Sequence, residues 1–504
     1  MKTKKRKKAA QRQRALQARL AHRDFSSPSQ PLLGDQPIRY EVSDRTRVVS
    51  MGGLGLIHGL VMKLKLPALL NGAIGGILKR HLPYWESDHI LALCYNVLTG
   101  GKPLQGLNRL RQDEVSLDAL GVTRLPAPST AGDFLRRFTS LRLILRLQEA
   151  INQARLKVWR RQPAAFRQQA TVDVDGTHLE TDAECMEGID YCAYKQLWGY
   201  GPLLITLAET REVLYVVNRS AAAPSHQDAP TWIDRTLALV GPVFEKVWVR
   251  GDTDFSLTTH LDDWDERAWF IFGVDAMPNL VALAQGVSQS EWAPLIRPPR
   301  YEVKTHLRCS PPKVKPLRIR QRRFEELHTV AEDVTSFPYR PGHCKKTYRL
   351  IVLRKQLHRR QGAQLLGEEI RYFFYITNEP SQPTDELVLF YDQRADQENT
   401  IAQLKSGLPA FHAPTHSFWA NWAYMIIAAL AWNLKAWYGL LLKEPSLRQQ
   451  VVRMEFKQFL QRFIHFPCQI IRQGRYLIYR IVHFTTDTLT LIKIANWLNA
   501  LAFP

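Results

Sequence analysis

The sequence predicts an α/β protein whose core is a mixed five-stranded sheet with helices, preceded and followed by helical regions. The hydrophobic periodicity changes near residue 170, where strand-like alternation replaces a helical pattern. The segments that follow read as three strands, a helix, a strand, a helix and a fifth strand, an order typical of an α/β layer. A β-rich segment then separates this pattern from two further helices, so we expect an insertion that interrupts the core.

The composition limits the class of protein and indicates its partner. A chain of 504 residues is too long for one compact core, and a hydrophobic content of 45% excludes a disordered protein. The formal net charge of +21 predicts an anionic partner, with nucleic acid as the first candidate and a membrane surface as the second. The six cysteines form no C-x-x-C pair, so neither a disulfide framework nor a zinc site is predicted.

The most apolar stretch does not predict a membrane span. Residues 418–442 are interrupted by Asn421, Asn433 and Lys435, and their longest apolar run is shorter than the ~18 residues that a span needs. We interpret this stretch as a buried helix. The basic N-terminus is not followed by the apolar segment of a signal peptide, so we expect a cytoplasmic protein without a membrane partner.

Changes in composition divide the chain into six predicted regions. Residues 1–23 contain ten Lys or Arg and no acid, which is typical of a disordered arm that contacts phosphates or is simply solvated. The regions are a basic disordered arm and linker (1–45), a helical DNA-binding domain (46–165), the first part of the core (166–280), a β-rich insertion (281–385), a Glu-bearing helix and the helix after it (386–440), and a basic helical C-terminal region (441–504). The basic helices of the second region suit a DNA groove, although such surfaces also simply keep a domain in solution.

Five segments predict the strands of the core, and two segments between them predict helices. The strands are TVDVDGT, PLLITLAE, VLYVVNR, KVWVRGD and WFIFGVD, and the helices are QDAPTWIDRTLALVG and LTTHLDDWDERA. In the insertion, TYRLIVLRK and IRYFFYITN predict two antiparallel neighbours. The polar segment YDQRADQENTIAQLK, residues 391–405, then predicts a helix.

Acidic residues stand at the ends of two predicted core strands. Asp175 ends the first strand and Asp252 ends the fourth, and these strands are expected neighbours because the second and third form hairpins off the first. Two carboxylates at one edge of a sheet repel each other unless they are protonated or bridged by a cation. Mg²⁺ prefers such oxygen ligands, and a third carboxylate, Glu398, would complete a two-metal site suited to displacement at phosphorus.

The polar helix carries a row of groups that suits a charged substrate. Tyr391, Arg394, Glu398 and Lys405 are at offsets 0, 3, 7 and 14, which places them within about 60° of one another on one helix face. Arg394 and Lys405 would then face phosphates beside Glu398. A plain i,i+4 ion pair between Arg394 and Glu398 is the simpler alternative.

Each aspartate also has a purely structural interpretation. Asp175 could cap Thr177 in an Asx-turn, and Asp252 could be the N-cap of a strand-to-helix turn. The order of strand, strand and helix in a strongly basic chain favours the catalytic interpretation.

The row of Tyr391, Arg394, Glu398 and Lys405 resembles the Y-R-E-K signature of a large group of bacterial insertion-sequence transposases. VDVDGT is similar to the first-aspartate strand of that group, and VWVRGDTDF is similar to its second-aspartate strand, whose common form is R-A-D-S-G-F. The stretch LWGYGPLLITLAETREVLYVVNRSAAAPSH resembles the insertion-sequence family numbered thirteen-eighty. The resemblance extends from about residue 45 to 500.

The resemblance implies a metal site in an RNase H-like core of the retroviral integrase superfamily. It implies that the D-D-E metal ligands are Asp175, Asp252 and Glu398, and that the phosphate-binding groups are Tyr391, Arg394 and Lys405. Asp173 and Asp254 are rival acids. The assignment prefers Asp175 because a threonine, Thr177, follows it after one intervening residue, and Asp252 because Asp254 stands where the group has Gly.

The function that the resemblance implies is DNA transposition in the bacterial cytoplasm, at the nucleoid. A DDE transposase would bind the terminal inverted repeats of its insertion sequence, cleave each end with two Mg²⁺ ions, for which Mn²⁺ may substitute, and join the freed 3′-OH to target DNA. Pairing of two ends implies a homodimer, and a hairpin intermediate is expected from related transposases. The alternatives are a metal-dependent nuclease, a transposase-derived DNA-binding protein without catalysis, and a glycosidase, which would not explain the positive charge.

Overall fold

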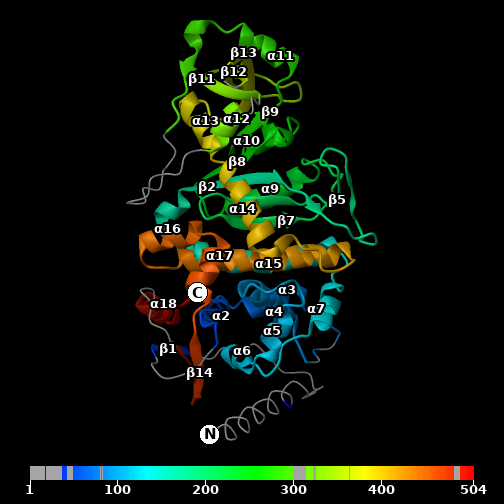
Figure 1. Ribbon diagram of the computed structural model, residues 1–504, viewed down its shortest axis with the longest axis vertical. Helices are drawn as coiled ribbons and strands as arrows, with labels where there is room; N and C mark the ends of the chain where they lie inside the picture. Colours follow the sequence, from blue (N-terminus) through cyan, green and yellow to red (C-terminus); the bar gives the residue numbers. More distant parts are fainter. Residues whose placement is uncertain are drawn as a thin grey trace.

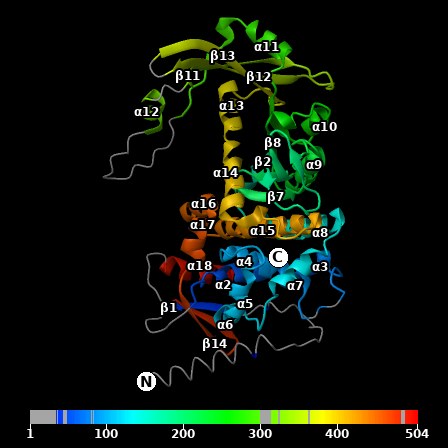
Figure 2. The ribbon, with the colours of Figure 1, turned by 45° about the vertical axis from the view of Figure 1, so that its right-hand side comes forward.

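The computed structural model describes residues 18, 34, 37–42, 49–79, 81, 83–298, 314–321, 325–361, 364–481 and 488–503 (Figures 1 and 2). The predicted basic arm at residues 1–23 therefore lies almost wholly outside the described residues. In the described part, a long mixed sheet occupies the upper half of the molecule and helices occupy the lower half, with α15 (Phe418–Leu440) between them.

The predicted core strands form one half of this sheet, in the order β7-β6-β2-β8-β9. Their bounds are β2 (Gln169–Gly176), β6 (Leu203–Leu207), β7 (Glu212–Val217), β8 (Lys246–Gly251) and β9 (Trp269–Val274). The central strand β2 runs parallel to β8 and antiparallel to β6, and β6 and β7 form a hairpin. The predicted neighbours of the first strand are therefore confirmed.

The insertion extends the core sheet, so the predicted five-stranded sheet is wrong in its extent. Three long strands follow β10 (Ala293–Pro294) along the chain, namely β11 (Glu325–Tyr339), β12 (Tyr348–Gln361) and β13 (Gln364–Thr377). The two predicted antiparallel neighbours of the insertion are β12 and β13. The end of β13 pairs with β9 through residues 374–377 and 271–274, which gives one sheet of nine strands. This pairing satisfies backbone groups that the edge of β9 would otherwise expose.

Helices fill the region predicted as helical before the core. They are α2 (Leu54–Lys63), α3 (Leu66–Ile74), α4 (Glu86–Leu98), α5 (Leu107–Gln112), α6 (Glu114–Ala119), α7 (Pro128–Leu135) and α8 (Leu141–Arg160). The core has α9 (Ala229–Val240) and α10 (Leu261–Asp265) at the two predicted helices, and α10 is shorter than predicted. The insertion begins with α11 (Pro278–Gln285) and also contains α12 (Val314–Gln321).

Helix α15 is the predicted buried helix, and its burial is confirmed from Ala420 to Leu440. It lies between the sheet and the N-terminal helices, where it packs against β7, α4 and α8 (Figure 2). Within the described residues, no single helix is long and apolar enough to cross a membrane, and only the bent pair of α2 and α3 meets that test by length and composition.

The C-terminal region is not wholly helical, which corrects the prediction for residues 441–504. It contains α16 (Pro445–Arg453), α17 (Phe456–Phe459), β14 (Cys468–Gln473), β15 (Tyr476–Ile481) and α18 (Thr488–Ala500). The hairpin turns at Gly474, whose φ of +59° suits glycine. Strand β1 (Ile38–Val42), within the predicted disordered linker, pairs in parallel with β15. Two short segments rich in Ile and Tyr on either side of Gly474 were the signal for this hairpin.

A buried carboxylate joins three elements beneath the core sheet. Glu212 of β7 is fully buried and accepts hydrogen bonds from Arg155 of α8 (3.0 Å) and from Trp437 of α15 (2.6 Å). Its second oxygen accepts from Trp159 (2.9 Å) and Thr210 (2.7 Å). The Arg155 guanidinium is also fully buried, so each charge depends on the other for compensation.

Glu212→Gln is expected to lower the free energy of unfolding by about 3–5 kcal/mol, because it leaves the Arg155 charge buried without its counter-ion. Denaturant unfolding followed by tryptophan fluorescence measures the change, since Trp159 and Trp437 both contact Glu212. Glu291→Gln is the matched control, because Glu291 is exposed. Equal unfolding midpoints for the two variants would contradict the role given to the buried pair.

Candidate active site

The ends of β2 and β8 bring the two predicted aspartates together. The parallel register pairs Val174 with Gly251, so Asp175 and Asp252 are the next residues on neighbouring strands. Asp252 is the N-cap of a short 3₁₀ turn, where its Oδ1 accepts a hydrogen bond from the Asp254 amide at 3.1 Å. The N-cap interpretation of Asp252 is therefore correct as local structure, and it leaves the second oxygen for other partners. The Thr177 amide binds the Pro202 carbonyl, so the alternative in which Asp175 caps Thr177 is wrong.

The rival acid Asp173 has a different role from Asp175. Its two oxygens accept hydrogen bonds from Nε and Nη2 of Arg250, at 2.7 and 2.9 Å, and both side chains are only 1% exposed. Arg250 also donates to the carbonyl of Phe390 and lies 4.6 Å from the centre of that ring. This pair joins β2, β8 and the helix that carries Phe390. Both carboxylate oxygens of Asp173 are therefore used in this buried structural pair.

Burial and neighbouring acids make ionisation of Asp175 unfavourable. Burial raises its pKa to about 6, and the charges of Asp252 and Glu398 act in the same direction. The Arg394 guanidinium opposes this shift. Burial likewise raises the pKa of Asp252, with Arg394 opposing and Asp254 and Asp275 adding to the increase. The carboxylates therefore lie close enough to repel one another.

The predicted single helix over residues 391–405 is wrong in detail. It is divided into α13 (Thr384–Asp392), α14 (Ala395–Ala402) and a π-helical turn at Gln403–Gly407. At the junction, amide-to-carbonyl bonds span three residues, as from Arg394 to Tyr391 (2.9 Å), which tightens the chain. The two helices still form one column beside the sheet (Figure 2). The four signature residues therefore come from two helices and a wider turn.

Arg394 occupies the N-cap position of α14 and faces the aspartates. Its Nη1 lies 3.5 Å from Asp175 Oδ2, and its side chain is 15% exposed. Its buried Nε and Nη1 have no hydrogen-bond acceptor in the described part of the chain. Burial alone would lower its pKa, but Tyr391, Asp175 and Asp252 raise the pKa above its ordinary value. The guanidinium thus remains charged with donors to spare, and the predicted plain pair with Glu398 is replaced by one with Asp175.

Tyr391 packs at the end of α13 against the core strands. Its ring centre is 4.5 Å from that of Tyr375, and burial raises its pKa. A Cβ at Gly273 would meet the Tyr391 hydroxyl at 2.9 Å, so this glycine lets the tyrosine approach β9 closely. The sequence analysis did not identify Gly273 because only the three-dimensional packing shows this requirement.

Glu398 is exposed on α14, and its position is fixed by its neighbour Gln397. The buried Gln397 amide donates to the carbonyls of Asp173 (3.0 Å) and Leu204 (3.3 Å), on β2 and β6. These bonds hold α14 across the centre of the sheet. Glu398 is close enough to raise the pKa of Asp175 by charge repulsion. Gln397 was missed in the sequence analysis, since a glutamine beside an acid carries no signal of its own.

Lys405 lies in the π-helical turn and is exposed. Burial of its amine lowers its pKa, Lys195 lowers it further, and Asp175 opposes the change. Lys195 belongs to a hairpin that the sequence analysis did not predict. A second lysine therefore lies near Lys405, supplied by a different segment.

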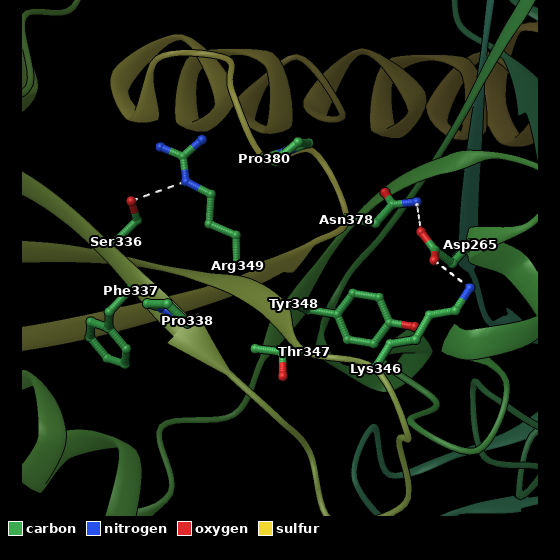
Figure 3. Close-up of a pocket in the computed structure, with 10 residues that line it drawn as sticks. All are labelled: Asp265, Ser336, Phe337, Pro338, Lys346, Thr347, Tyr348, Arg349, Asn378 and Pro380. Atoms are coloured by element: carbon green, nitrogen blue, oxygen red, sulfur yellow. Dashed lines mark hydrogen bonds and ion pairs between the residues drawn. The ribbon is translucent and has the colours of Figure 1, made fainter.

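The cavity in Figure 3 lies away from these residues, where the insertion joins the core. It is about 440 Å³ in volume, and none of the six predicted site residues lines it. Asp265 there pairs with Lys346 at 2.7 Å and accepts from Asn378 at 2.8 Å. Arg349 donates to Ser336 at 3.0 Å. These groups satisfy one another, so the cavity is part of a structural joint.

The model of the family described as "Transposase DDE domain group 1" matches residues 31–502. The chain belongs to this DDE transposase family. Such transposases cleave and join phosphodiester bonds and generally use divalent metal ions. The predicted transposase class is therefore confirmed, while the Y-R-E-K group and the family numbered thirteen-eighty stay predictions.

Two further comparisons concern curated proteins and solved structures. No curated protein matches the chain. Among solved structures, it is similar to the piggyBac transposase synaptic complex with hairpin DNA, determined by cryo-electron microscopy. The identity is 12%, the TM-score is 0.36, and the match covers 83% of this chain and 84% of that chain.

The donor set of the transposase suits a divalent ion. All three candidate ligands are carboxylates, which Mg²⁺ and Mn²⁺ prefer, and their mutual repulsion is what a bound cation relieves. In the described part of the chain, no three acid, histidine or cysteine side chains already lie close enough to hold one ion. The residues thus fit a metal by chemistry and by strand register, and the side chains must draw together to bind it.

The raised pKa of Asp175 predicts a pH-dependent gain in stability from Asp175→Asn. The folded carboxyl keeps its proton up to a pKa of about 6, whereas the unfolded one ionises near 3.8, so the free energy of unfolding falls as pH rises through this window. Removing the ionisable group should stabilise the metal-free protein by up to about 3 kcal/mol at neutral to alkaline pH. Near pH 4 the variant should differ little from the wild type.

Thermal and denaturant unfolding in EDTA at both pH values measures this difference. Asp182→Asn serves as the control because Asp182 is exposed, and it should change stability little at either pH. A stabilisation by Asp175→Asn that is the same at both pH values, or absent at both, would contradict the electrostatic description of the site.

Proposed function

We propose that the transposase binds the terminal inverted repeats of its own insertion sequence and moves the element by cut-and-paste transposition. The observation that carries this proposal is the register of β2 and β8, which presents Asp175 and Asp252 side by side beneath a helix bearing Glu398. The net charge of +21 supports double-stranded DNA as the partner, both as element ends and as target. The strand order β7-β6-β2-β8-β9 supports an RNase H-like core.

Asp175 and Asp252 would hold two Mg²⁺ ions, for which Mn²⁺ could substitute, and Glu398 would complete the ligands of the second ion. When bound, such ions activate the attacking oxygen and stabilise the leaving oxygen of an in-line displacement. Burial and the nearby charges of Asp252 and Glu398 raise the pKa of Asp175, and this supports the assignment because a bound cation would offset both unfavourable effects.

Tyr391, Arg394 and Lys405 bind the phosphates next to the cleaved bond. Arg394 supports this role because its buried Nε and Nη1 have no hydrogen-bond acceptor in the described residues, and a phosphate would supply one. The Tyr391 ring lies 5.8 Å from the guanidinium carbon of Arg394, and Lys405 adds a positive charge that interacts with Asp175. Their positive field also draws the DNA backbone towards the acids.

The reaction comprises two displacements at phosphorus. In the first, water attacks the phosphodiester at the element end, and the 3′ oxygen leaves as a free 3′-OH. In the second, that 3′-OH attacks a phosphodiester of target DNA, which releases the target's own 3′-OH. A hairpin route for the second strand of each end is the expected variant. Two ends must be held together, so the working complex is a homodimer on DNA, at the nucleoid in the cytoplasm, with the helices of 46–165 contacting DNA.

Two weaker candidates share parts of this site. A nuclease without strand transfer needs the same three acids, and only the second displacement distinguishes it. A DNA-binding protein without catalysis does not need them, and all three are present.

The test is cleavage of labelled element-end DNA by the full-length transposase with Mg²⁺ or Mn²⁺. Asp252→Asn and Glu398→Gln are each expected to lower the rate of nicking by a factor on the order of 10³ or more, because each removes a metal ligand. Asp254→Asn is the matched variant for the rival acid and should keep cleavage. Strand transfer into plasmid DNA separates a transposase from a nuclease.

Retained binding of end DNA, measured by a mobility shift, shows that the inactive variants are folded. The assignment of the acids is contradicted if Glu398→Gln cleaves normally, or if Asp254→Asn, but not Asp252→Asn, loses cleavage. Absence of cleavage by the wild-type protein, with DNA still bound, would favour the non-catalytic alternative.

A further inference from the structure

An unpredicted hairpin beside the active site exposes a cluster of aromatic rings. It consists of β4 (Asp190–Cys192) and β5 (Leu197–Tyr200), which form a small sheet with β3 (Leu179–Glu180), and β5 stands at the side of the core sheet in Figure 1. Tyr194 is 84% exposed, Trp198 is 54% exposed and Tyr191 is 42% exposed. In the described residues, Phe373 is the only other exposed aromatic side chain of this kind. Large exposed aromatic clusters usually mark a binding surface.

The register of the hairpin explains why the rings share one face. Tyr191 lies directly opposite Trp198, and their ring centres are 5.6 Å apart. The next residues along each strand, Cys192 and Gly199, are buried, as alternation in a strand requires. The outer face therefore presents two adjacent rings, and Tyr194 adds a third at the turn.

The turn of the hairpin carries positive charge towards the active site. Lys195 Nζ lies 4.6 Å from the centre of the Tyr194 ring. Besides the dominant effect of burial, Lys195 lowers the pKa of both His178 and Lys405, and Lys405 in turn interacts with Asp175. Cys192 of β4 lies 3.4 Å from His178, measured from Sγ to Nε2, and His178 is three residues beyond Asp175, so the hairpin stands next to the end of β2 that carries the acids.

The hairpin is anchored firmly to the rest of the protein. The Glu187 amide donates to His416 (2.8 Å), and the Tyr200 hydroxyl donates to the Glu187 carbonyl (2.6 Å). The amide of Phe418, at the start of α15, donates to the Glu187 carboxylate (3.0 Å). The rings consequently stand on a fixed support beside the site.

We propose that this hairpin binds an unpaired DNA strand next to the cleavage site, with its bases stacked on Tyr191, Tyr194 and Trp198 and its phosphates beside Lys195 and Lys405. Exposed rings with a lysine beside them suit a single strand because every base offers a ring face and every linkage a negative charge. In an intact duplex those ring faces are covered by neighbouring base pairs. Glu180, Asp182 and Glu184 line a hollow together with Trp198 on the side of β3. Their charge would repel phosphates, so the strand would place its bases over Trp198 and its phosphates on the side of Lys195. The inference rests on the proposed function, because transposition supplies the strand that is unpaired when an element end is opened.

Fluorescence anisotropy in EDTA tests the proposal with two probes, an element-end duplex carrying a short oligothymidine tail and the same duplex fully paired. The double variant Tyr194→Ala with Trp198→Ala should bind the tailed probe about 10-fold more weakly or worse, since stacking contributes about that factor per base. It should bind the paired probe within about twofold of the wild type. The single variant Trp198→Phe should keep most of the wild-type preference for the tailed probe, because a ring face remains at this position.

Phe373→Ala is the matched control, because it removes an exposed ring from β13, in the insertion, and should not affect either probe. Equal loss on both probes, or no loss on the tailed probe, would overturn the proposal. A changed association state in sedimentation with an unchanged tail preference would assign the rings to contact between copies of the chain and would also overturn it. Failure of the wild type to bind either probe would instead contradict the proposed function itself.

Discussion

The buried ion pair between Asp173 and Arg250 is the interaction on which the geometry of the site depends. It ties β2 to β8 through two hydrogen bonds at 2.7 and 2.9 Å, in an interior where separating the charges would be strongly unfavourable. The same guanidinium binds the Phe390 carbonyl, so it also positions the end of α13. Two residues further along β2, Asp175 reaches the sheet edge, where its partner is Arg394 at 3.5 Å and not a bidentate core pair like that of Asp173.

The site is unstable by itself, and that instability indicates its chemistry. Burial raises the pKa of both Asp175 and Asp252, neighbouring carboxylates raise each further, and in the metal-free structure the positive charge of Arg394 opposes these increases. In the proposed reaction, the carboxylates would bind metal ions. Arg394 would then donate hydrogen bonds to a phosphate from the nitrogens that have no acceptor in the described residues. Gln397 fixes the position of α14 relative to the sheet, because its amide donates hydrogen bonds to backbone carbonyls of β2 and β6. Asp173, Arg250 and Gln397 thus stabilise the fold next to the site carboxylates, which destabilise it.

Sequence reasoning reached the strand ends because alternation and hairpin logic are local, and Asp175 and Asp252 follow from them once β2 and β8 are neighbours. It did not separate Asp173 from Asp175 by physics, because the distinction depends on a partner 77 residues away that only the register reveals. The division of the polar helix near Arg394 also escaped it, since no Gly or Pro marks that junction. The nine-stranded sheet was missed because β13 pairs with β9 across the edges of two sheets predicted separately, the insertion and the core. Nothing in the sequence of either strand identifies the other as its partner.

The central claim is that Asp175, Asp252 and Glu398 together bind divalent metal. The most direct measurement is anomalous scattering from Mn²⁺ in crystals of the transposase bound to element-end DNA. The account predicts Mn²⁺ at the ends of β2 and β8, with Asp175 and Asp252 as ligands and Glu398 drawn towards it from α14. Mn²⁺ bound by Asp254 in place of Asp252, or crystals soaked in Mn²⁺ that show none at this edge of the sheet, would contradict the account.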